Sequence, residues 1–245
     1  RRVKKIRKWQ VDGEIMAENL KINIGCGQAA TSADGWVNID KSPNAWLAKH
    51  KGVRWVLKTL RMVPSTTYKT NYREDVQVVD VQKRGLPVEE GTASWIYCSH
   101  LIGSMNRDEA LCLLKECKRA LKSGGRIRIV TPDLQALAKR WGRSADAYLK
   151  GNREYFMVWD NQELAIGDCF VKSLELELFT RTKLNRLQRL FDYPLQYFYD
   201  FESLELVLLN AGFSKVEKLS YRDSTMPDVD RLDQYPDALH VEGVR

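Results

Sequence analysis

The chain has 245 residues, of which 44% are hydrophobic and 10% aromatic, and this composition excludes global disorder and fits one globular domain with an insertion. The net charge of +7 is concentrated at one end, because residues 1–8 hold six basic side chains and no acid, leaving 33 basic and 32 acidic residues elsewhere. A nearly neutral body argues against nucleic acid as a partner. No apolar run approaches the ~20 residues of a membrane-spanning helix, so no membrane span is predicted.

The cysteines and the start of the chain indicate its surroundings. The five cysteines are odd in number and include no CxxC pair, so neither a disulfide framework nor a zinc site is predicted. Reduced thiols in the cytoplasm are expected. The chain begins with Arg1 instead of Met, and we expect it to be part of a longer protein. Residues 1–19 are interpreted as a basic N-terminal extension, most simply a solvated tail.

The first elements alternate between strand and helix patterns. Residues 20–25 (LKINIG) form an apolar run that ends in glycine, and residues 36–40 (WVNID) form a run that ends in an acid, so both predict strands. Ser42 and Pro43 are typical of an N-cap and a first helical turn, and they predict a short helix. Residues 51–75 are polar and are predicted to be an irregular insertion or lid.

The same alternation continues through the middle of the chain. Residues 76–81 (VQVVDV) and 94–98 (SWIYC) predict a third and a fourth strand. Residues 107–122 have apolar side chains at helical spacing, with acids in the first turn and bases in the last. Residues 126–131 (RIRIVT) alternate and predict a fifth strand. The pattern indicates an α/β, Rossmann-like, doubly wound sheet whose strand ends and ligands gather at one edge.

The last third of the chain interrupts this pattern once. Residues 134–197 are rich in aromatic and charged side chains and are predicted to be a mostly helical insertion that caps the sheet edge. Asp200 then caps a helix, and residues near 214–220 and 238–244 predict two final strands. The prediction is therefore a mostly parallel, seven-stranded sheet in one domain, residues 20–245, with the helical insertion before the last helix and strands.

A glycine turn follows the first predicted strand. The run that starts at Gly25-Cys26-Gly27 fits the dinucleotide fingerprint, in which glycine lets the backbone approach a ligand closely. Asp40 ends the second strand, where a carboxylate can accept hydrogen bonds from both hydroxyls of a ribose. Only nine residues, 28–36, lead from the glycine turn into the second strand, which leaves little room for a phosphate-binding helix. The short loop favours a nucleoside without a pyrophosphate.

The third strand ends in similar chemistry at the same edge. Asp80 and Val81 lie where an adenine would meet one polar and one apolar group. Each of the acids Asp40 and Asp80, taken alone, also fits a strand-end turn. Three strands with matching ends favour an adenosine site over three unrelated turns.

Six segments together resemble the class I S-adenosylmethionine (SAM)-dependent methyltransferases, most closely a small branch common in polysaccharide-biosynthesis clusters. These segments are LKINIGCG (20–27), GWVNID (35–40), VVDVQKRGLPVEEGTASWIYCSH (78–100), LLKECKRALKSGGRIRIVTPDL (113–134), YDFESLELVLLNAGF (199–213) and ALHVEG (238–243). The resemblance implies a transferase that uses SAM and releases S-adenosyl-L-homocysteine (SAH). The implied cofactor-binding residues are Gly25, Cys26, Gly27, Asp40, Asp80, Val81 and Ser99.

The resemblance also implies catalytic candidates. His100 at the end of the fourth strand and Asp133 after the fifth are the candidate general bases, because a base speeds reaction at a weak hydroxyl nucleophile by ~10²–10⁴-fold. Each also has a structural interpretation, His100 as a strand-end histidine and Asp133 as a helix N-cap. Similar proteins usually continue S-H-x-L-E-H, whereas this chain has Gly103 and Ser104 in place of the acid and the second histidine.

The implied activity is O-methylation of a sugar hydroxyl in a glycan or glycan precursor. The expected partners are a carbohydrate acceptor and a glycosyltransferase, either fused to this chain or acting with it. Two alternatives stay open, namely RNA methylation, which the basic tail motivates, and a non-catalytic scaffold, which Gly103 and Ser104 motivate. A divalent metal is not predicted, although four acids carry suitable oxygen ligands: Asp133, Asp160, Glu163 and Asp168.

Overall fold

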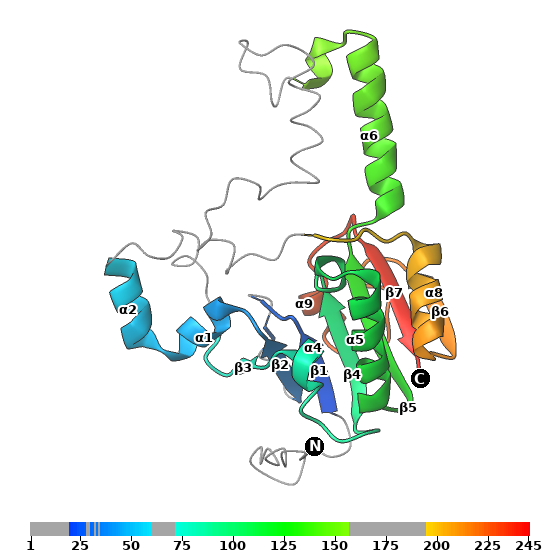
Figure 1. Cartoon of the computed structure of the whole chain (residues 1–245). Helices are drawn as coiled ribbons and strands as arrows, with labels where there is room; N and C mark the ends of the chain where they lie inside the picture. Colours follow the sequence, from blue (N-terminus) through cyan, green and yellow to red (C-terminus); the bar gives the residue numbers. More distant parts are fainter. Residues whose placement is uncertain (1–19, 28–29, 32, 34, 60–71, 157–194) are drawn as a thin grey trace.

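Seven strands form one sheet in the computed structural model, which describes residues 20–27, 30–31, 33, 35–59, 72–156 and 195–245 (Figure 1). The strands are β1 Leu20–Ile24, β2 Trp36–Asp40, β3 Gln77–Val78, β4 Ala93–Ser99, β5 Leu121–Thr131, β6 Lys215–Leu219 and β7 Leu239–Val244. Their order is β3-β2-β1-β4-β5-β7-β6. Neighbours are parallel except β7, which is antiparallel to β5 and to β6. The predicted Rossmann-like, mostly parallel sheet is confirmed.

The strand order reverses beside β1, and this reversal positions the ligand edge. β1 pairs in parallel with β2 on one side and with β4 on the other. The carboxyl ends of these strands therefore meet at one edge, where open α/β sheets bind their ligands. Ile24, Asp40 and Ser99 are the last residues of the three strands.

Helices cover both faces of the sheet (Figure 1). The helices of the described part of the chain are α1 Pro43–Lys49, α2 Lys51–Thr59, α4 Val81–Arg84, α5 Arg107–Ala120, α6 Leu134–Leu149, α8 Phe201–Ala211 and α9 Val229–Leu232, with 3-10 turns η1 Ile102–Ser104 and η2 Arg153–Phe156. The main core packs α5 and α8 against one face, where Ile96 and Cys98 of β4 are buried. Tyr97 points to the other face, into a smaller core shared with Val229 and Leu232 of α9. This alternation follows from the period of two along a strand.

The two longest sequence-predicted helices begin at capping boxes. Asn106 accepts a hydrogen bond from Glu109 N and so begins α5, while the Glu109 carboxylate accepts one from Asn106 N. Asp200 caps α8 in the same way, and α8 ends at Gly212, whose φ is +93°. Both helices confirm the predictions, because caps satisfy backbone N–H groups that otherwise have no partner.

Two predicted elements were wrong in part. Residues 51–75 were expected to be irregular, but α2 occupies Lys51–Thr59, with Val53 and Val56 at helical spacing among basic residues. The third strand was expected over residues 76–81, but β3 is only Gln77–Val78. The Asp80 side chain accepts a hydrogen bond from Gln82 N and turns the chain into α4, so Val81 is the first helical residue instead of a strand residue.

The insertion begins with a long helix, as predicted. α6 starts directly after β5 and extends away from the sheet (Figure 1). Residues 1–19 and 157–194 lie outside the described residues, so the basic extension and the covering of the sheet edge by the insertion stay predictions, as does the division into domains. None of the described helices is long and apolar enough to cross a membrane.

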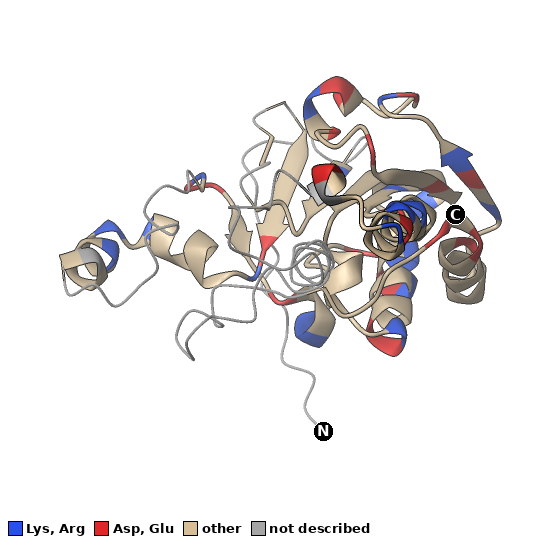
Figure 2. Cartoon of the chain, turned by 90° about the horizontal axis from the view of Figure 1, so that it is seen from above, with Lys and Arg blue, Asp and Glu red and all other residues tan. Residues whose placement is uncertain are grey.

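The charged residues and the cysteines are distributed in the described part of the chain as follows. Seen from above, basic and acidic residues are interspersed over the described elements (Figure 2). Four cysteines in the described part of the chain are free thiols, namely Cys26, Cys98, Cys112 and Cys117. Cys169 lies outside that part.

Candidate active site

A cleft of about 530 Å³ opens where β1, β2 and β4 end. This volume lies within the ~300–1,000 Å³ typical of small-molecule sites. Seven of the nine site residues expected from the sequence line it: Gly25, Cys26, Gly27, Asp40, Val81, Ser99 and His100. Asp80 and Asp133 do not. The topology thus brings together residues from three strand ends, as the βα alternation predicts.

The glycine turn forms the floor of the cleft. Gly25 and Gly27 have φ values of +65° and +51°, in the left-handed region that favours glycine. Gly25 N and Cys26 N both donate to Ile39 O, at 2.8 and 3.2 Å, which fixes the turn to β2. A Cβ on Gly25 would lie 2.9 Å from Leu101 Cδ2, whereas a Cβ on Gly27 would meet nothing closer than Tyr72 Oη at 3.9 Å. Gly25 is therefore closely packed, and Gly27 leaves space for a ligand.

Alanine substitutions separate these two roles. Gly27→Ala is expected to lower the free energy of unfolding by ~1 kcal/mol, the cost of a left-handed alanine. Gly25→Ala adds a clash with Leu101 and is expected to cost at least ~2 kcal/mol. Urea denaturation of both variants measures the difference. Equal losses would contradict the packing difference between the two positions.

Asp40 holds this turn and still has acceptor capacity. Asp40 is 8% exposed, and its carboxylate accepts from Gly27 N at 2.7 Å and from Ser42 N at 2.6 Å. A carboxylate has about four lone-pair sites, so two remain for a ligand that donates hydrogen bonds. Burial, and to a smaller extent the Asp40 charge, raise the pKa of the Cys26 thiol well above its usual range, so this thiol stays protonated and unreactive.

The segment that follows β3 contributes a wall different from the one expected. Val81 lines the cleft together with Val79 and Gln82, which the sequence did not single out. Asp80 is outside the lining because its carboxylate accepts from Gln82 N at 3.2 Å and lies 4.0 Å from Lys83 Nζ. A role for Asp80 beside an adenine stays a prediction.

His100 lies at the end of β4 with a backbone that is unusual for histidine. Its φ is +54°, a region sparsely occupied by residues other than glycine and asparagine. His100 N donates to Val130 O at 2.8 Å, and Nδ1 is 3.1 Å from Ser99 Oγ. Burial and the nearby His240 lower the pKa of His100. The imidazole is therefore neutral near pH 7 and able to accept a proton.

A second cavity of about 220 Å³ lies beyond His100. Asp133 lines this cavity instead of the main cleft, and it also caps α6 by accepting from Gln135 N at 2.9 Å. His100 and Tyr235 line both cavities, and their ring centroids are 4.1 Å apart. The two rings form the wall between the cavities. Tyr235 lies in the loop between α9 and β7, and no sequence pattern assigned it to the site.

Gly103 is closely packed against the segment that follows the insertion. Gln196 N and Tyr197 N both donate to Gly103 O, at 2.7 and 3.1 Å. A Cβ on Gly103 would lie 2.9 Å from Leu195 Cδ2 and 3.2 Å from Tyr197 O. The segment 195–199 thus fills the space that a larger residue at position 103 would need.

Metal ligands are not grouped in the described residues. No cluster of three or more His, Cys, Asp or Glu side chains that could hold an ion occurs in the described ranges. Asp160, Glu163 and Asp168 lie outside those ranges.

Two histidines, His100 and His240, are expected to make the free energy of unfolding depend on pH. Burial is the main cause that lowers the pKa of both His100 and His240, so the folded state disfavours their protonation. Between pH 7 and 5 the unfolded chain takes up more protons, and the free energy of unfolding is expected to fall with pH. Chemical denaturation at both pH values measures this fall. It should shrink in the double variant His100→Asn/His240→Gln and persist in His50→Gln, whose ring is exposed.

Comparison with known proteins gives similar folds and no family. No family model and no curated protein matches the sequence. A SAM-dependent methyltransferase from Archaeoglobus fulgidus is similar at 11% identity and a TM-score of 0.47, covering 94% of this chain and 87% of that one. PigF, solved with SAH, has 16% identity, a TM-score of 0.44 and coverages of 95% and 58%. The methyltransferase SibL has 14% identity, a TM-score of 0.43 and coverages of 93% and 50%.

The chain therefore spans half the length of SibL and 58% of that of PigF. The structures that this chain resembles include SAM-dependent methyltransferases, and these three do not point to glycan biosynthesis.

Proposed function

We propose that this protein is a SAM-dependent methyltransferase. The observation that carries the proposal is the pairing of Asp40 with the open glycine turn at the reversal of the strand order. The carboxylate has acceptor sites left for the two ribose hydroxyls, and Gly27 leaves space above its backbone for the methionine part. Val79 and Val81 offer apolar walls to an adenine, and Gln82 offers an amide.

The same geometry disfavours a dinucleotide. The Gly27 N–H, which would bind a phosphate in such a site, already donates to the Asp40 carboxylate at 2.7 Å. A buried negative charge there repels a pyrophosphate. Residues 25–35 connect β1 to β2, and none of those described is helical. A nucleoside without phosphates fits both facts.

The chain's own groups suit methyl transfer to a hydroxyl. When bound, SAM would supply a methyl group on a positively charged sulfur, and an acceptor oxygen would bond to the methyl carbon as the carbon–sulfur bond breaks and SAH is released. Alignment of the reactants by the cleft contributes up to ~7–11 kcal/mol to such a reaction. His100 is the proposed base, because its neutral imidazole borders both cavities and can take the proton of an acceptor hydroxyl.

The proposed acceptor is a sugar hydroxyl bound in the second cavity. Asp133 and Asp237 offer carboxylates to the hydroxyls of a sugar, and the Tyr235 ring offers an aromatic face. Asp133 is less suited to be the base, since its carboxylate already caps α6.

Calorimetric titration with SAM, SAH and NAD⁺ tests the proposal. SAM and SAH are expected to bind and NAD⁺ is not. Failure of the folded protein to bind SAM would overturn it. Incubation with isotope-labelled SAM and a panel of sugar nucleotides, oligosaccharides and RNA, analysed by mass spectrometry, then identifies the acceptor class.

A further inference from the structure

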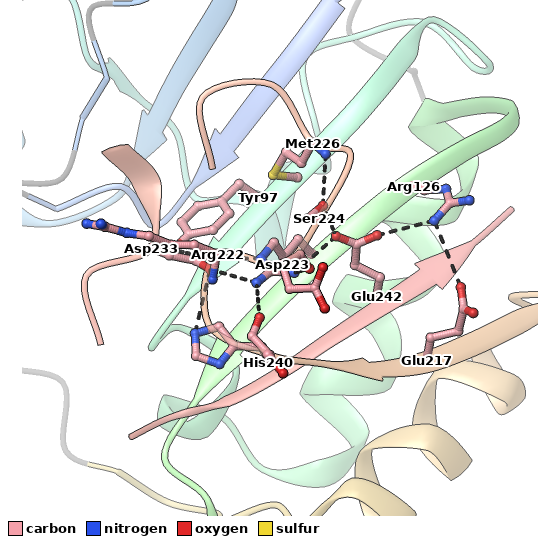
Figure 3. A network of polar contacts seen from close by, with 12 residues as sticks. Tyr97, Arg126, Glu217, Arg222, Asp223, Ser224, Met226, Asp233, His240 and Glu242 are labelled. Carbon is pink, nitrogen blue, oxygen red and sulfur yellow. Dashed lines mark hydrogen bonds and ion pairs between the residues drawn. The ribbon is translucent and has the colours of Figure 1, made fainter. Parts of the chain in front are cut away.

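A charged cluster is buried on the face of the sheet that α9 covers (Figure 3). Arg128 of β5 is 0% exposed, and its guanidinium donates to both oxygens of Asp233, at 3.2 and 2.6 Å. It also donates to Glu242 Oε1 at 3.1 Å. Asp233 and Glu242 are 0% and 1% exposed. Arg126, at 3.4 Å from Glu242, adds a second cation to the cluster.

The cluster fixes both ends of the segment 220–233 to the sheet. Arg128 donates to Ser220 O at 3.1 Å, and Arg222 N donates to Asp233 Oδ2 at 3.0 Å. From β4, the Tyr97 hydroxyl donates to Leu232 O at 2.8 Å and lies 3.2 Å from Asp233 Oδ1. Asp233 therefore has bonds to two strands and to its own segment, and its position is fixed from several directions.

The residues that follow Asp233 reach the candidate active site. Gln234 and Tyr235 line the main cleft, and the Tyr235 ring packs on the ring of His100. Only one residue separates the buried carboxylate from the ring that divides the two cavities. A shift of Asp233 would therefore change the position of the Tyr235 ring relative to the His100 ring.

A buried charged cluster is weak evidence for a stabilising role. Well-packed apolar residues of similar volume often stabilise a core as well as a buried ion pair does, or better. A bidentate arginine–carboxylate pair differs from an apolar contact in fixing the orientation of both groups. Such a pair suits a segment whose position matters more than its contribution to stability.

We propose that the Arg128–Asp233 pair positions Tyr235 against His100 and so sets the opening between the cofactor cleft and the second cavity. This inference rests on the proposed function, in which the acceptor reaches the methyl group at that wall. Arg128 and Asp233 are positioning residues, and Tyr235 is the group that borders both cavities.

Nuclear magnetic resonance of the histidine rings tests the positioning without an acceptor. The chain has three histidines, so labelled imidazole resonances are few. The Tyr235 ring lies 4.1 Å from that of His100 and shifts its C–H resonances by ring current. Tyr235→Ala defines the shift lost when the ring is absent, and Tyr235→Phe should retain it. His50, stacked on Trp46 at 4.0 Å, is the internal control.

Asp233→Asn is expected to displace the His100 resonances most of the way toward their positions in Tyr235→Ala and to leave His50 unchanged. Arg128→Lys keeps the charge but loses the bidentate geometry, and should displace them in the same direction. It serves as the second variant should Asp233→Asn not fold. Unmoved His100 resonances in whichever variant folds would overturn the proposal, even if that variant unfolds at a lower temperature.

Calorimetry with SAM separates this inference from the proposed function. Both variants should still bind SAM, with an affinity within about tenfold of the unmodified protein, because Asp40 and the glycine turn lie at the ends of β1 and β2, whereas the cleft residues expected to move with Asp233 are Gln234 and Tyr235. If the two variants lost SAM binding while the unmodified protein kept it, the role of the Arg128–Asp233 pair would not be confined to the wall between the cavities, and the proposal would be overturned. If the unmodified protein did not bind SAM, the methyltransferase proposal would be refuted. The resonance experiment would still decide whether the Arg128–Asp233 pair positions Tyr235.

Discussion

Asp40→Asn is expected to weaken SAM binding by at least ~100-fold. Hydrogen bonds to a charged acceptor contribute ~1.5–3 kcal/mol each, and the substitution weakens both bonds from the ribose. It also places an NH₂ group against either Gly27 N or Ser42 N, which now donate to the two carboxylate oxygens. The glycine turn would then lose one of its fixed contacts.

Calorimetry measures the affinity, and thermal unfolding shows whether the variant is folded. Asp146→Asn is the matched control, because this exposed carboxylate pairs with Lys150 at 2.8 Å on α6, away from the cleft. The control should bind SAM as the unmodified protein does. Unchanged SAM affinity in folded Asp40→Asn would refute the assignment of the ribose to this carboxylate.

His100→Asn is expected to reduce methyl transfer by ~10²–10⁴-fold and to leave SAM affinity nearly unchanged, because it removes the proposed base. Asparagine is the informative replacement, since it tolerates the left-handed backbone of His100, whose φ is +54°. The measurement is turnover of the acceptor that the panel identifies, compared with SAM affinity by calorimetry.

The pH profile gives a second test of the same residue. Since burial lowers the pKa of His100 below its usual 6.5, the rate should fall on the acid side with an apparent pKa below that value. The acid-side fall should disappear in His100→Asn. Asp133→Asn tests the alternative base, and turnover that is unaltered in both variants would exclude both residues.

Local sequence patterns were sufficient to predict the strands and helices that position this site. Apolar runs punctuated by Gly25, Asp40 and Ser99 give the strand ends, and the alternation with helices makes the strands parallel. Parallel strands connected by crossovers of one hand present these ends at one edge. The capped helices were also predictable, because a cap needs only residues three or four positions apart.

Local hydrogen bonds moved two predicted carboxylates out of the cleft. Asp80 lies two residues after β3 and Asp133 two residues after β5, and both accept a backbone N–H two residues later, so each begins a helix instead of lining the main cleft. The sequence allowed either outcome for each acid, because short acidic side chains compete for nearby backbone donors. Only the path of the chain after each strand decided between them.

The tertiary structure alone decided the wall between the cavities and the cluster behind it. Alternation in residues 126–131 places Arg126 and Arg128 on one face of β5, but it cannot show what covers that face. The segment 220–233 covers it, buries Arg128 and brings Tyr235 to His100. The spacing of apolar residues along the chain shows to which face a side chain points. Its partner across the fold depends on contacts between residues far apart in the sequence, and such contacts leave no periodic pattern.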